Sequence, residues 1–564
     1  MAKPKKITQN INKDAGLLDL PQVRPVRSRW EMKHSNYISS NIGQIVPIYC
    51  EEVLPSTKRR ITMGMLSHMT TPIAPIFNAQ YTEFRAFFVP HRLSADLLNG
   101  YSTRKSPYVK VFGEDNASTG ARVIVPLSEQ KLPTLSSQAI TDFMTAIFNP
   151  FGGIADALDL DSPTIGDDVR DFTANCNFLN ISAYELIYQY KYRNQNRESA
   201  TNSPLYRYLF NAYNRSSSIA FSDNFEIANR EKDYFTGSQP FTLKSNEPIT
   251  AGLTGEAVVN ATLVGGSSDP RSTQLRVASG SSDVVIANAG SSPSGSSIKL
   301  MADLSSASGV DIEQLRIMIK TNELLEKDMM YGNDFISSMN SHFGTSPMSL
   351  VLEEPLELKR TTITSQMQPI FQTSTTANEQ TILGTIGANA TTQSGEFEVV
   401  PLTEFKEYGY LIICACHKAQ NSYDSRQYKP KHIFKKNRFD FYTPELNDLG
   451  YQPVSRLEFN ALAYDDNVNE AVSFNEAFAE YRFRFNKCHA MFEPSRPNAL
   501  SYWTLAMTDY GDIQSIYKQG VEELDRAVSI KSNLDPQFFD AYGFVEDTDE
   551  PMTLHSIPGM DGVI

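Results

Sequence analysis

The residues of this chain that could do chemistry lie in small groups that lack the partners their chemistry requires. Cys414, Cys416 and His417 lie close together, but no second pair of ligands follows at the spacing of a zinc site. Cys488 and His489 are neighbours. Adjacent residues of a strand point to opposite faces, so this pair does not form a nucleophile and its base. We therefore expect neither a metal centre nor cysteine catalysis.

Other signatures of enzymes are also missing. The sequence has no Gly-Lys-Ser/Thr phosphate loop, no H-E-x-x-H zinc motif and no G-x-S-x-G nucleophile motif. A group of aspartates could hold Ca²⁺, but the Gly and the terminal Glu of a calcium loop are absent, so we expect a solvated acidic surface. These aspartates are Asp156, Asp159, Asp161, Asp167 and Asp168. The sequence predicts no cofactor, no metal and no enzymatic activity.

The strongest functional pattern is a segment rich in Lys and Arg with interleaved aromatic residues, at positions 423–441. Cations can contact phosphates, and aromatic rings can stack on unpaired bases. The pattern therefore indicates a packaging surface rather than a catalytic pocket, with these side chains as candidate contacts to nucleic acid; the alternative is pairing with acidic neighbours at a contact between subunits. The candidate residues are Arg426, Lys429, Lys431, Lys435, Lys436 and Arg438, with the rings of Tyr423, Tyr428 and Phe434.

A second basic segment lies at the N-terminus. Residues 1–33 carry eight Lys or Arg against three Asp or Glu, and Pro4, Pro21 and Pro25 disfavour a long helix or a central strand. We expect an extended basic arm, in which Lys3, Lys5, Lys6 and Lys13 are the candidate phosphate contacts. The alternative is a frayed, solvated terminus.

Composition limits the possible classes of protein. The 564 residues include 21% charged and 11% aromatic residues, which is typical of a globular protein, and the net charge of −14 restricts any nucleic-acid contact to local patches. Five widely spaced cysteines do not make a disulfide framework, which favours folding in a reducing cytoplasm. No apolar run is long enough to span a membrane, and we expect no signal peptide and no membrane insertion.

The elements that must position these residues are mainly strands. Apolar runs and alternating patterns predict strands at 41–53, 81–89, 361–371, 397–400, 408–416, 479–485 and 502–505. Apolar residues at helical spacing predict helices at 181–196 and 311–343. Between them, residues 245–309 alternate Ser/Gly tracts with short β-branched pieces, which predicts small hairpins in a surface insertion.

Several multi-residue motifs resemble the major capsid proteins of microviruses, the small single-stranded DNA phages, and most of all the gokushovirus type. The chain departs from the family at Tyr408-Gly409, where His-Gly is usual, and at Gly450-Tyr451-Gln452, where Gly-Glu-Gln is usual. The matching motifs include Val53-Leu54-Pro55, Phe87-Phe88-Val89-Pro90, Asp233-Tyr234-Phe235-Thr236, Glu407-Tyr408-Gly409-Tyr410, Arg438-Phe439-Asp440-Phe441-Tyr442 and Pro444-Glu445-Leu446.

The resemblance implies a mainly β fold, a single eight-stranded antiparallel jelly roll with large loop and helical insertions. We expect an interior-facing arm at 1–40, the first part of the jelly roll at 41–244, a threefold protrusion at 245–309, and the helical segment with the remaining strands and the tail at 310–564. The implied function is that of a major capsid protein. It would self-assemble through pentamers into a T=1 icosahedral shell around a circular single-stranded DNA genome.

The resemblance also implies partners and a location. These are small basic DNA-binding or scaffolding viral proteins and a host cell-surface receptor, with assembly in the bacterial cytoplasm and a final place in the virion. The insertion is the candidate for host attachment, at Gly265, Ser267, Arg271, Arg276 and Ser281. Two alternatives remain at this point: a carbohydrate-binding β-sandwich, and a hydrolase whose site these motifs miss.

Overall fold

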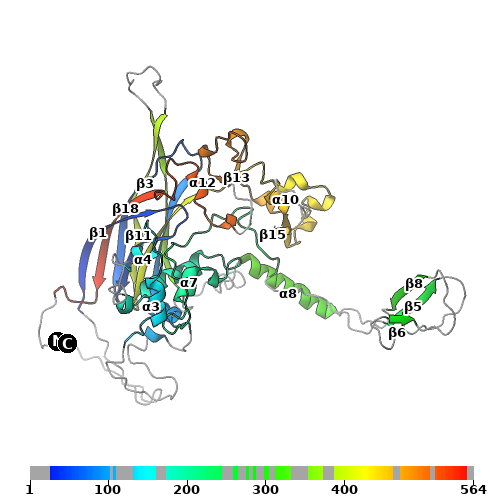
Figure 1. Ribbon diagram of the computed structural model, residues 1–564, viewed down its shortest axis with the longest axis horizontal. Helices are drawn as coiled ribbons and strands as arrows, with labels where there is room; N and C mark the ends of the chain where they lie inside the picture. The colour runs from blue at the N-terminus through cyan, green and yellow to red at the C-terminus, as the bar shows by residue number, and fades with distance from the viewer. Residues whose placement is uncertain are drawn as a thin grey trace, which may run out of the picture. The chain divides into compact units, whose positions relative to one another are not determined.

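The computed structural model divides the chain into two units, Met1–Pro240 with Asp334–Ile564, and Phe241–Asn333 (Figure 1). In the first unit it describes residues 26–101, 106–108, 131–160, 173–240, 354–371, 386–461, 471–507 and 515–555. In the second it describes 241–243, 258–264, 275–277, 284–286, 297–303 and 312–331.

Two antiparallel sheets form the centre of the first unit. The five-stranded sheet has the order β1-β18-β3-β11-β10, and Figure 1 shows β1, β18 and β3 side by side. Its strands are β1 (Ser28–Ser40), β18 (Phe538–Glu550), β3 (Lys58–Met69), β11 (Ile386–Glu404) and β10 (Gln366–Phe371). The four-stranded sheet has the order β2-β12-β4-β9, from β2 (Val46–Val53), β12 (Gly409–Ala419), β4 (Gln80–Pro90) and β9 (Leu356–Thr364). The fold is therefore mainly β, as expected.

The chain passes repeatedly from one sheet to the other. β1 and β3 belong to the five-stranded sheet, whereas β2 and β4 belong to the four-stranded sheet. β9 lies beside β4 in the four-stranded sheet. The later strands alternate between the sheets again: β11 is in the five-stranded sheet, β12 in the four-stranded sheet and β18 in the five-stranded sheet. As a result, β18, from the end of the chain, lies between β1 and β3, from its beginning.

Side chains from the facing surfaces of both sheets form one hydrophobic core. The ring of Phe84 on β4 lies 5.2 Å from Phe397 on β11 and 6.0 Å from Tyr542 on β18, between ring centroids. β18 alternates buried and exposed residues, the pattern of a strand with one solvated face. β4 and β12 are buried almost throughout. The four-stranded sheet therefore has a cover on its second face as well.

Helices provide that cover. α6 (Leu179–Ile187) contacts both β4 and β12, and the Tyr184 hydroxyl on α6 donates to the Ile45 carbonyl at 2.7 Å. α6 continues as a π-helical turn, η2 (Tyr188–Tyr192). The predicted helix at 181–196 is therefore confirmed, although it begins at Leu179 and ends at Tyr192. The other helices of this layer are α1 (His91–Leu98), α3 (Ser137–Met144), α4 (Ile154–Ala157), η3 (Ala200–Asn202) and α7 (Pro204–Leu209).

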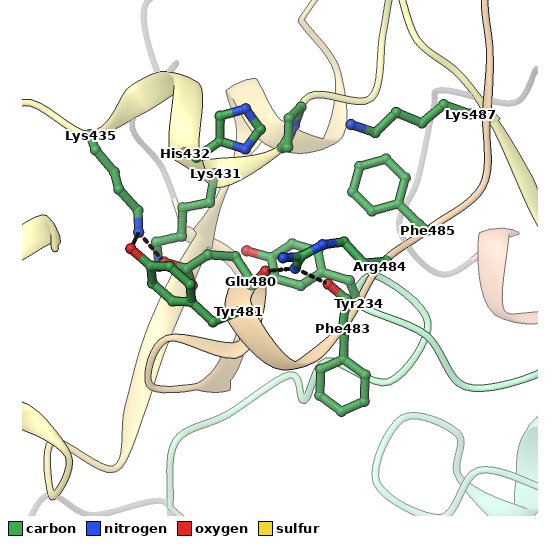
Figure 2. Close-up of a pocket in the computed structure, with 11 residues that line it drawn as sticks. Tyr234, Lys431, His432, Lys435, Glu480, Tyr481, Phe483, Arg484, Phe485 and Lys487 are labelled. Atoms are coloured by element: carbon green, nitrogen blue, oxygen red, sulfur yellow. Dashed lines mark hydrogen bonds and ion pairs between the residues drawn. The ribbon is translucent and has the colours of Figure 1, made fainter. Parts of the chain in front are cut away.

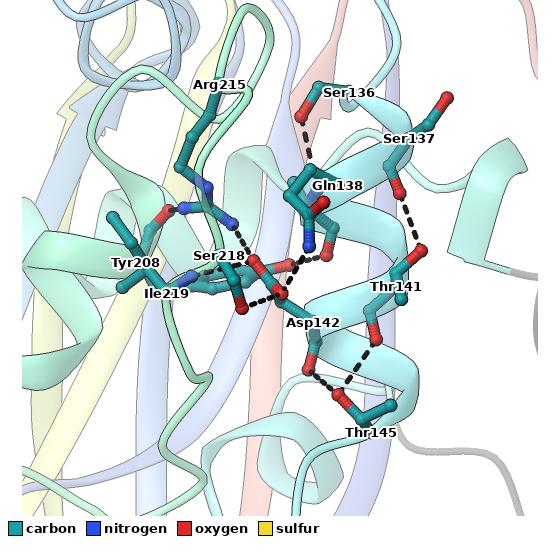
Figure 3. A network of polar contacts seen from close by, with 11 residues as sticks. Ser136, Ser137, Gln138, Thr141, Asp142, Thr145, Tyr208, Arg215, Ser218 and Ile219 are labelled. Atoms are coloured by element: carbon teal, nitrogen blue, oxygen red, sulfur yellow. Dashed lines mark hydrogen bonds and ion pairs between the residues drawn. The ribbon is translucent and has the colours of Figure 1, made fainter.

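The buried carboxylate of Asp142 connects separate segments of the helical layer (Figure 3). Asp142 on α3 pairs with Arg215 at 3.1 Å, and both side chains are 4% exposed. Asp142 also accepts hydrogen bonds from the Ile219 N–H at 2.9 Å, the Ser218 hydroxyl at 2.7 Å and the Gln138 amide at 2.9 Å. Burial alone would raise the pKa of Asp142, but these donors and Arg215 hold it below its ordinary value.

A second polar tie connects the two sheets. His417 on β12 contacts the Thr82 hydroxyl on β4 through Nδ1 and the Asp540 carboxylate on β18 through Nε2, each at 2.8 Å. The imidazole also stacks on Phe538, with centroids 3.9 Å apart. His417 is 3% exposed, so its ring holds the sheets together and is out of reach of a ligand.

Between β12 and β18 the chain makes a long excursion, residues 420–537, built of short elements. We call it the β12–β18 excursion. Its elements are β13 (Ser422–Asp424), η4 (Lys431–Phe434), η5 (Arg438–Asp440), η6 (Pro444–Leu446), β14 (Tyr451–Ser455), α10 (Arg456–Phe459), β15 (Ala471–Glu476), α11 (Ala479–Arg482), β16 (Lys487–Cys488), η7 (Ala490–Phe492), η8 (Ser501–Trp503), β17 (Ala506–Met507), η9 (Ser515–Tyr517) and α12 (Glu522–Asp525).

The second unit contains two antiparallel strand pairs and a helix. β5 (Val258–Val264) pairs with β8 (Ser297–Asp303), and β6 (Leu275–Val277) pairs with β7 (Val284–Ile286). α8 (Ile312–Tyr331) follows. The predictions of small hairpins and of a helix after residue 311 are confirmed, although residues 332–343 lie outside the described part of the chain.

Three predictions of local structure were wrong. Residues 479–485 form α11 and an irregular segment, because Phe478 takes a left-handed conformation (φ 58°) that breaks an extended chain. Residues 501–503 form η8, where Trp503 packs against Phe77. Of the arm expected at 1–40, residues 28–40 form β1, which pairs with β18 along its whole length.

Candidate functional site

The excursion begins with a cluster of buried aromatic rings. Tyr423 and Tyr428 are 0% and 1% exposed, and their centroids lie 5.3 and 5.4 Å from that of Phe235. The Tyr423 hydroxyl donates to the Asp233 carboxylate at 2.6 Å. Burial and that carboxylate raise the pKa of Tyr423 well above its ordinary value, so its hydroxyl stays protonated.

This burial corrects the candidate stacking residues. A base can stack only on a ring that solvent reaches, and the rings of Tyr423 and Tyr428 are enclosed by Phe235, Phe459 and Phe485. These two tyrosines are therefore structural in the folded chain. Phe434, on η4, is partly exposed.

The six candidate cations divide into three pairs. Arg426 donates to the Ser495 carbonyl at 2.7 Å, and Lys429 donates to the Ser425 carbonyl at 2.6 Å, so both support the local backbone. Lys436 and Arg438 are exposed. Lys431 and Lys435 line a pocket.

The pocket lies between η4 and the segment that follows α11 (Figure 2). It has a volume of about 370 Å³. We call it the Lys487 pocket; it is lined by Tyr234, Pro430, Lys431, His432, Lys435, Glu480, Tyr481, Phe483, Arg484, Phe485 and Lys487.

One wall of the pocket holds a buried ion pair. The Lys435 ammonium lies 2.5 Å from the Glu480 carboxylate, with side chains 3% and 9% exposed, and 3.0 Å from the Tyr481 hydroxyl. Burial lowers the pKa of Lys435, but Glu480 and Tyr481 outweigh this effect and raise it. Lys435 and Glu480 therefore pair with each other in the wall of the pocket.

Three further cations border the pocket. Arg484 donates to the carbonyls of Glu480 and Phe483, and Lys431 donates to the Gln452 amide oxygen at 3.1 Å. The Lys487 ammonium lies 4.8 Å from the Phe485 ring centroid. Within the described part of the chain, none of the three cations forms an ion pair with a carboxylate.

The neighbouring cations affect the pKa of Lys487. Burial, followed by repulsion from Lys429 and Arg484, lowers its pKa below the ordinary value. A cation that is disfavoured by other cations is stabilised by any anion that enters. Lys431 interacts electrostatically with the carboxylates of Asp440 and Glu458, so its charge is partly compensated. Arg484 and Lys487 place positive charge beside aromatic walls, as sites for single-stranded nucleic acids do.

The segment 480–487 was missed as a candidate site. Its alternation of aromatic and basic residues, YRFRFNK at 481–487, was interpreted as a strand. The same alternation lines the pocket with Tyr481, Phe483 and Phe485 and with Arg484 and Lys487. The informative feature of this segment was that basic and aromatic residues occur together in it, rather than that they alternate with a period of two residues.

The thiols do not form a reactive site. Burial raises the pKa of both Cys414 and Cys416 to about 12, so neither is a thiolate at neutral pH. No group of three or more His, Cys, Asp or Glu side chains with metal-binding geometry occurs in the described residues. Of the acidic group, Asp156 and Asp159 are described; the other three lie outside that part of the chain.

Other candidate residues fall where the structure gives no side-chain information. Lys3, Lys5, Lys6 and Lys13 lie outside the described residues, as do Gly265, Ser267, Arg271 and Ser281. Arg276 lies on β6. No helix in the described ranges is both long and apolar enough to cross a membrane.

Comparison with known proteins gives matches along almost the whole chain. The family described as capsid protein (F protein) matches residues 19–560. Capsid protein VP1 of Spiroplasma virus 4 is 25% identical over 95% of both chains. Capsid protein VP1 of Bdellovibrio phage phiMH2K is 24% identical over 96% of this chain and 97% of the relative, and that of Chlamydia phage 1 is 22% identical over 99% and 100%.

Proposed function

Because the chain belongs to the capsid protein (F protein) family of phages, and is thus a structural protein of the virion rather than an enzyme, we propose that it builds a T=1 icosahedral shell. Pentamers of the chain would assemble around a circular single-stranded DNA genome. The carbohydrate-binding and hydrolase alternatives lose their support, since the matching relatives are capsid proteins over nearly their full length.

Strand order supports a shell-forming jelly roll. Eight strands divide into β1-β18-β3-β11 and β2-β12-β4-β9, and the chain alternates between these sheets except from β4 to β9. This order supports the proposed jelly roll of two Greek keys, an architecture that is common in viral capsids. In this interpretation β10 is an added strand at one edge, and the helices and the excursion are insertions.

Local positive charge supports the enclosure of DNA. The chain has a net charge of −14, yet Lys436 and Arg438 are exposed and two cations of the Lys487 pocket have no carboxylate partner within the described residues. Unpaired cations beside aromatic rings are the observation that carries the proposal. Lys3, Lys5, Lys6 and Lys13 would add phosphate contacts from the N-terminal arm.

The test replaces exposed cations and measures packaged DNA. Lys436→Glu with Arg438→Glu should give particles of normal size with less DNA, because neither side chain supports the fold. Lys435 is unsuitable, since a glutamate there would face Glu480 in a buried wall. Normal DNA content with failed assembly would instead assign these cations to a subunit contact.

Host attachment is proposed for the insertion at 245–309. The insertion belongs to the second unit of the chain, whereas the sandwich belongs to the first. Changes in the hairpins of the insertion should therefore leave the core strands intact. Repeated weak contacts across a shell gain avidity, which suits surface loops.

The deletion that tests attachment should remove residues 265–296 and join β5 to β8 by a two-residue turn, which keeps that pair. We expect particles that assemble but adsorb poorly to cells. Unchanged adsorption would remove the proposed role, and lost assembly would make the insertion structural.

A further inference from the structure

We propose that the Lys487 pocket binds one nucleotide of single-stranded DNA, with the base against Phe485 and the phosphate near Lys431, Arg484 and Lys487. The proposal rests on the proposed enclosure of DNA and deepens it. Three of the pocket residues that it uses, Arg484, Phe485 and Lys487, were not candidates from the sequence.

The ring of Phe485, against which the base would stack, is held in place by neighbouring aromatic residues. Phe485 is anchored from behind by Phe235 and Tyr423, whose centroids lie 4.9 and 5.3 Å away, and Tyr234 stacks beside it at 6.3 Å. The buried tyrosines therefore position a partly exposed ring instead of stacking on a base themselves. A ring held in place loses little conformational entropy on binding.

The phosphate side is also held by the fold. The Arg484 guanidinium is oriented by the Glu480 and Phe483 carbonyls, and Figure 2 shows these contacts on the side of the pocket opposite His432. Lys487 projects over the ring of Phe485. Lys431 reaches the pocket from η4. One phosphodiester would supply a negative charge beside these cations, of which Arg484 and Lys487 have no carboxylate partner within the described residues.

Size and chemistry favour a nucleotide over simpler ligands. A volume of about 370 Å³ falls at the small end of the range of about 300–1,000 Å³ for small-molecule sites. Inorganic phosphate would use the cations and leave the partly exposed ring of Phe485 uncovered. An acidic peptide would satisfy the charge but lacks the flat π-surface that stacks on Phe485.

The test uses capsid protein freed of packaged nucleic acid. Binding of fluorescein-labelled oligo(dT) is measured by anisotropy and compared with an abasic oligomer of the same length. We expect the abasic oligomer to bind about tenfold more weakly, as expected for the loss of base stacking. We also expect dTMP to compete better than inorganic phosphate. Equal binding of the two oligomers, or equal competition, would show an anion site only and overturn the proposal.

A charge-matched pair of variants locates the site. Lys487→Gln should weaken oligo(dT) binding about tenfold and reduce the salt dependence by about one phosphate contact. Lys531→Gln, which removes one exposed cation outside the pocket, should leave binding unchanged. Equal effects of the two variants would overturn the proposal. Phe485→Leu should weaken oligo(dT) but not the abasic oligomer, provided that its thermal unfolding matches the parent.

Failure of this proposal is distinguishable from failure of the proposed function. If Lys436→Glu with Arg438→Glu reduces DNA content while Lys487→Gln does nothing, DNA is enclosed but the pocket is not its site. If poly-glutamate binding depends on Lys487 and dTMP does not compete, the pocket serves an acidic protein partner and the nucleotide proposal is wrong.

Discussion

The buried charges of the sandwich with its helical layer differ from two exposed cations of the β12–β18 excursion in whether they have partners. In the first region, Asp142 has four partners and Asp540 has His417, drawn from elements far apart in sequence. In the excursion, Arg484 and Lys487 are exposed and have no carboxylate partner within the described residues. The first set of charges stabilises the fold, whereas the second remains available to a ligand.

The difference follows from solvent access. An unpaired charge in the interior loses its hydration without compensation, so interior charges require several partners. A cation at a pocket mouth keeps part of its hydration and can exchange water for an anion. Mutations should therefore affect stability in one region and binding in the other.

The largest expected effect comes from Asp142→Ala. This change leaves Arg215 buried without its carboxylate, and breaking such a pair costs about 3–5 kcal/mol. Denaturant unfolding at fixed protein concentration measures the loss, with the exposed Asp535→Ala as a control expected within about 0.5 kcal/mol. Equal effects at the two positions would contradict the contrast between the regions.

The same carboxylate predicts a pH dependence. The folded pKa of Asp142 is lowered, so its contribution is present above the unfolded pKa and is lost as pH falls through the folded value. Parent protein should therefore lose stability on acidification below about pH 4, near the unfolded pKa. The Asp142→Ala variant should lose less over the same range; parallel pH curves would argue against this assignment.

A smaller effect is expected where the two sheets are joined. His417→Leu leaves the Asp540 carboxylate and the Thr82 hydroxyl without the imidazole, which should cost about 2 kcal/mol or more. Unfolding of the variant measures the cost. A loss below about 0.5 kcal/mol would mean that the cross-sheet contact adds little to stability.

The third substitution, at Glu185, is expected to stabilise the protein instead of destabilising it. Glu185 is buried beside Glu226; burial and then that neighbour raise its pKa well above the ordinary value, and its Oε2 has no hydrogen-bond partner. A raised folded pKa means that stability falls as pH rises from the unfolded towards the folded pKa. Glu185→Gln should therefore stabilise the protein by about 1 kcal/mol or more at pH 7, and the gain should vanish near pH 4. A destabilised variant at pH 7 would contradict this.

The smallest change in stability is expected in the excursion. Lys487→Gln removes repulsion with Lys429 and Arg484 and breaks no ion pair, so its free energy of unfolding should stay within about 0.5 kcal/mol of the parent. A loss above about 1 kcal/mol would make Lys487 structural and remove the contrast.

Long apolar runs made the sandwich predictable. Residues 81–89 fall within β4, and residues 409–416 of the predicted strand 408–416 fall within β12. Both strands are buried on both faces, and a long apolar run is enough to predict such a strand. The basic character of the excursion was equally visible. Tyr423 and Tyr428 were wrongly predicted to stack on bases because their burial depends on the tertiary fold. Both rings are covered by Phe235, from a distant part of the chain. The strand predicted at 479–485 failed because the alternation there lines a pocket and does not form a ladder.

The central place of β18 has a consequence for the timing of synthesis. Residues 538–550 emerge from the ribosome after every other strand of the two sheets, yet they pair with both β1 and β3. Until then, β1 and β3 each lack the neighbour that lies between them, and the five-stranded sheet cannot close. The contacts that complete it span nearly the whole chain, which makes closure slow and exposes unpaired edges to aggregation. A chain that terminates before residue 538 never acquires β18, so its five-stranded sheet stays open between β1 and β3.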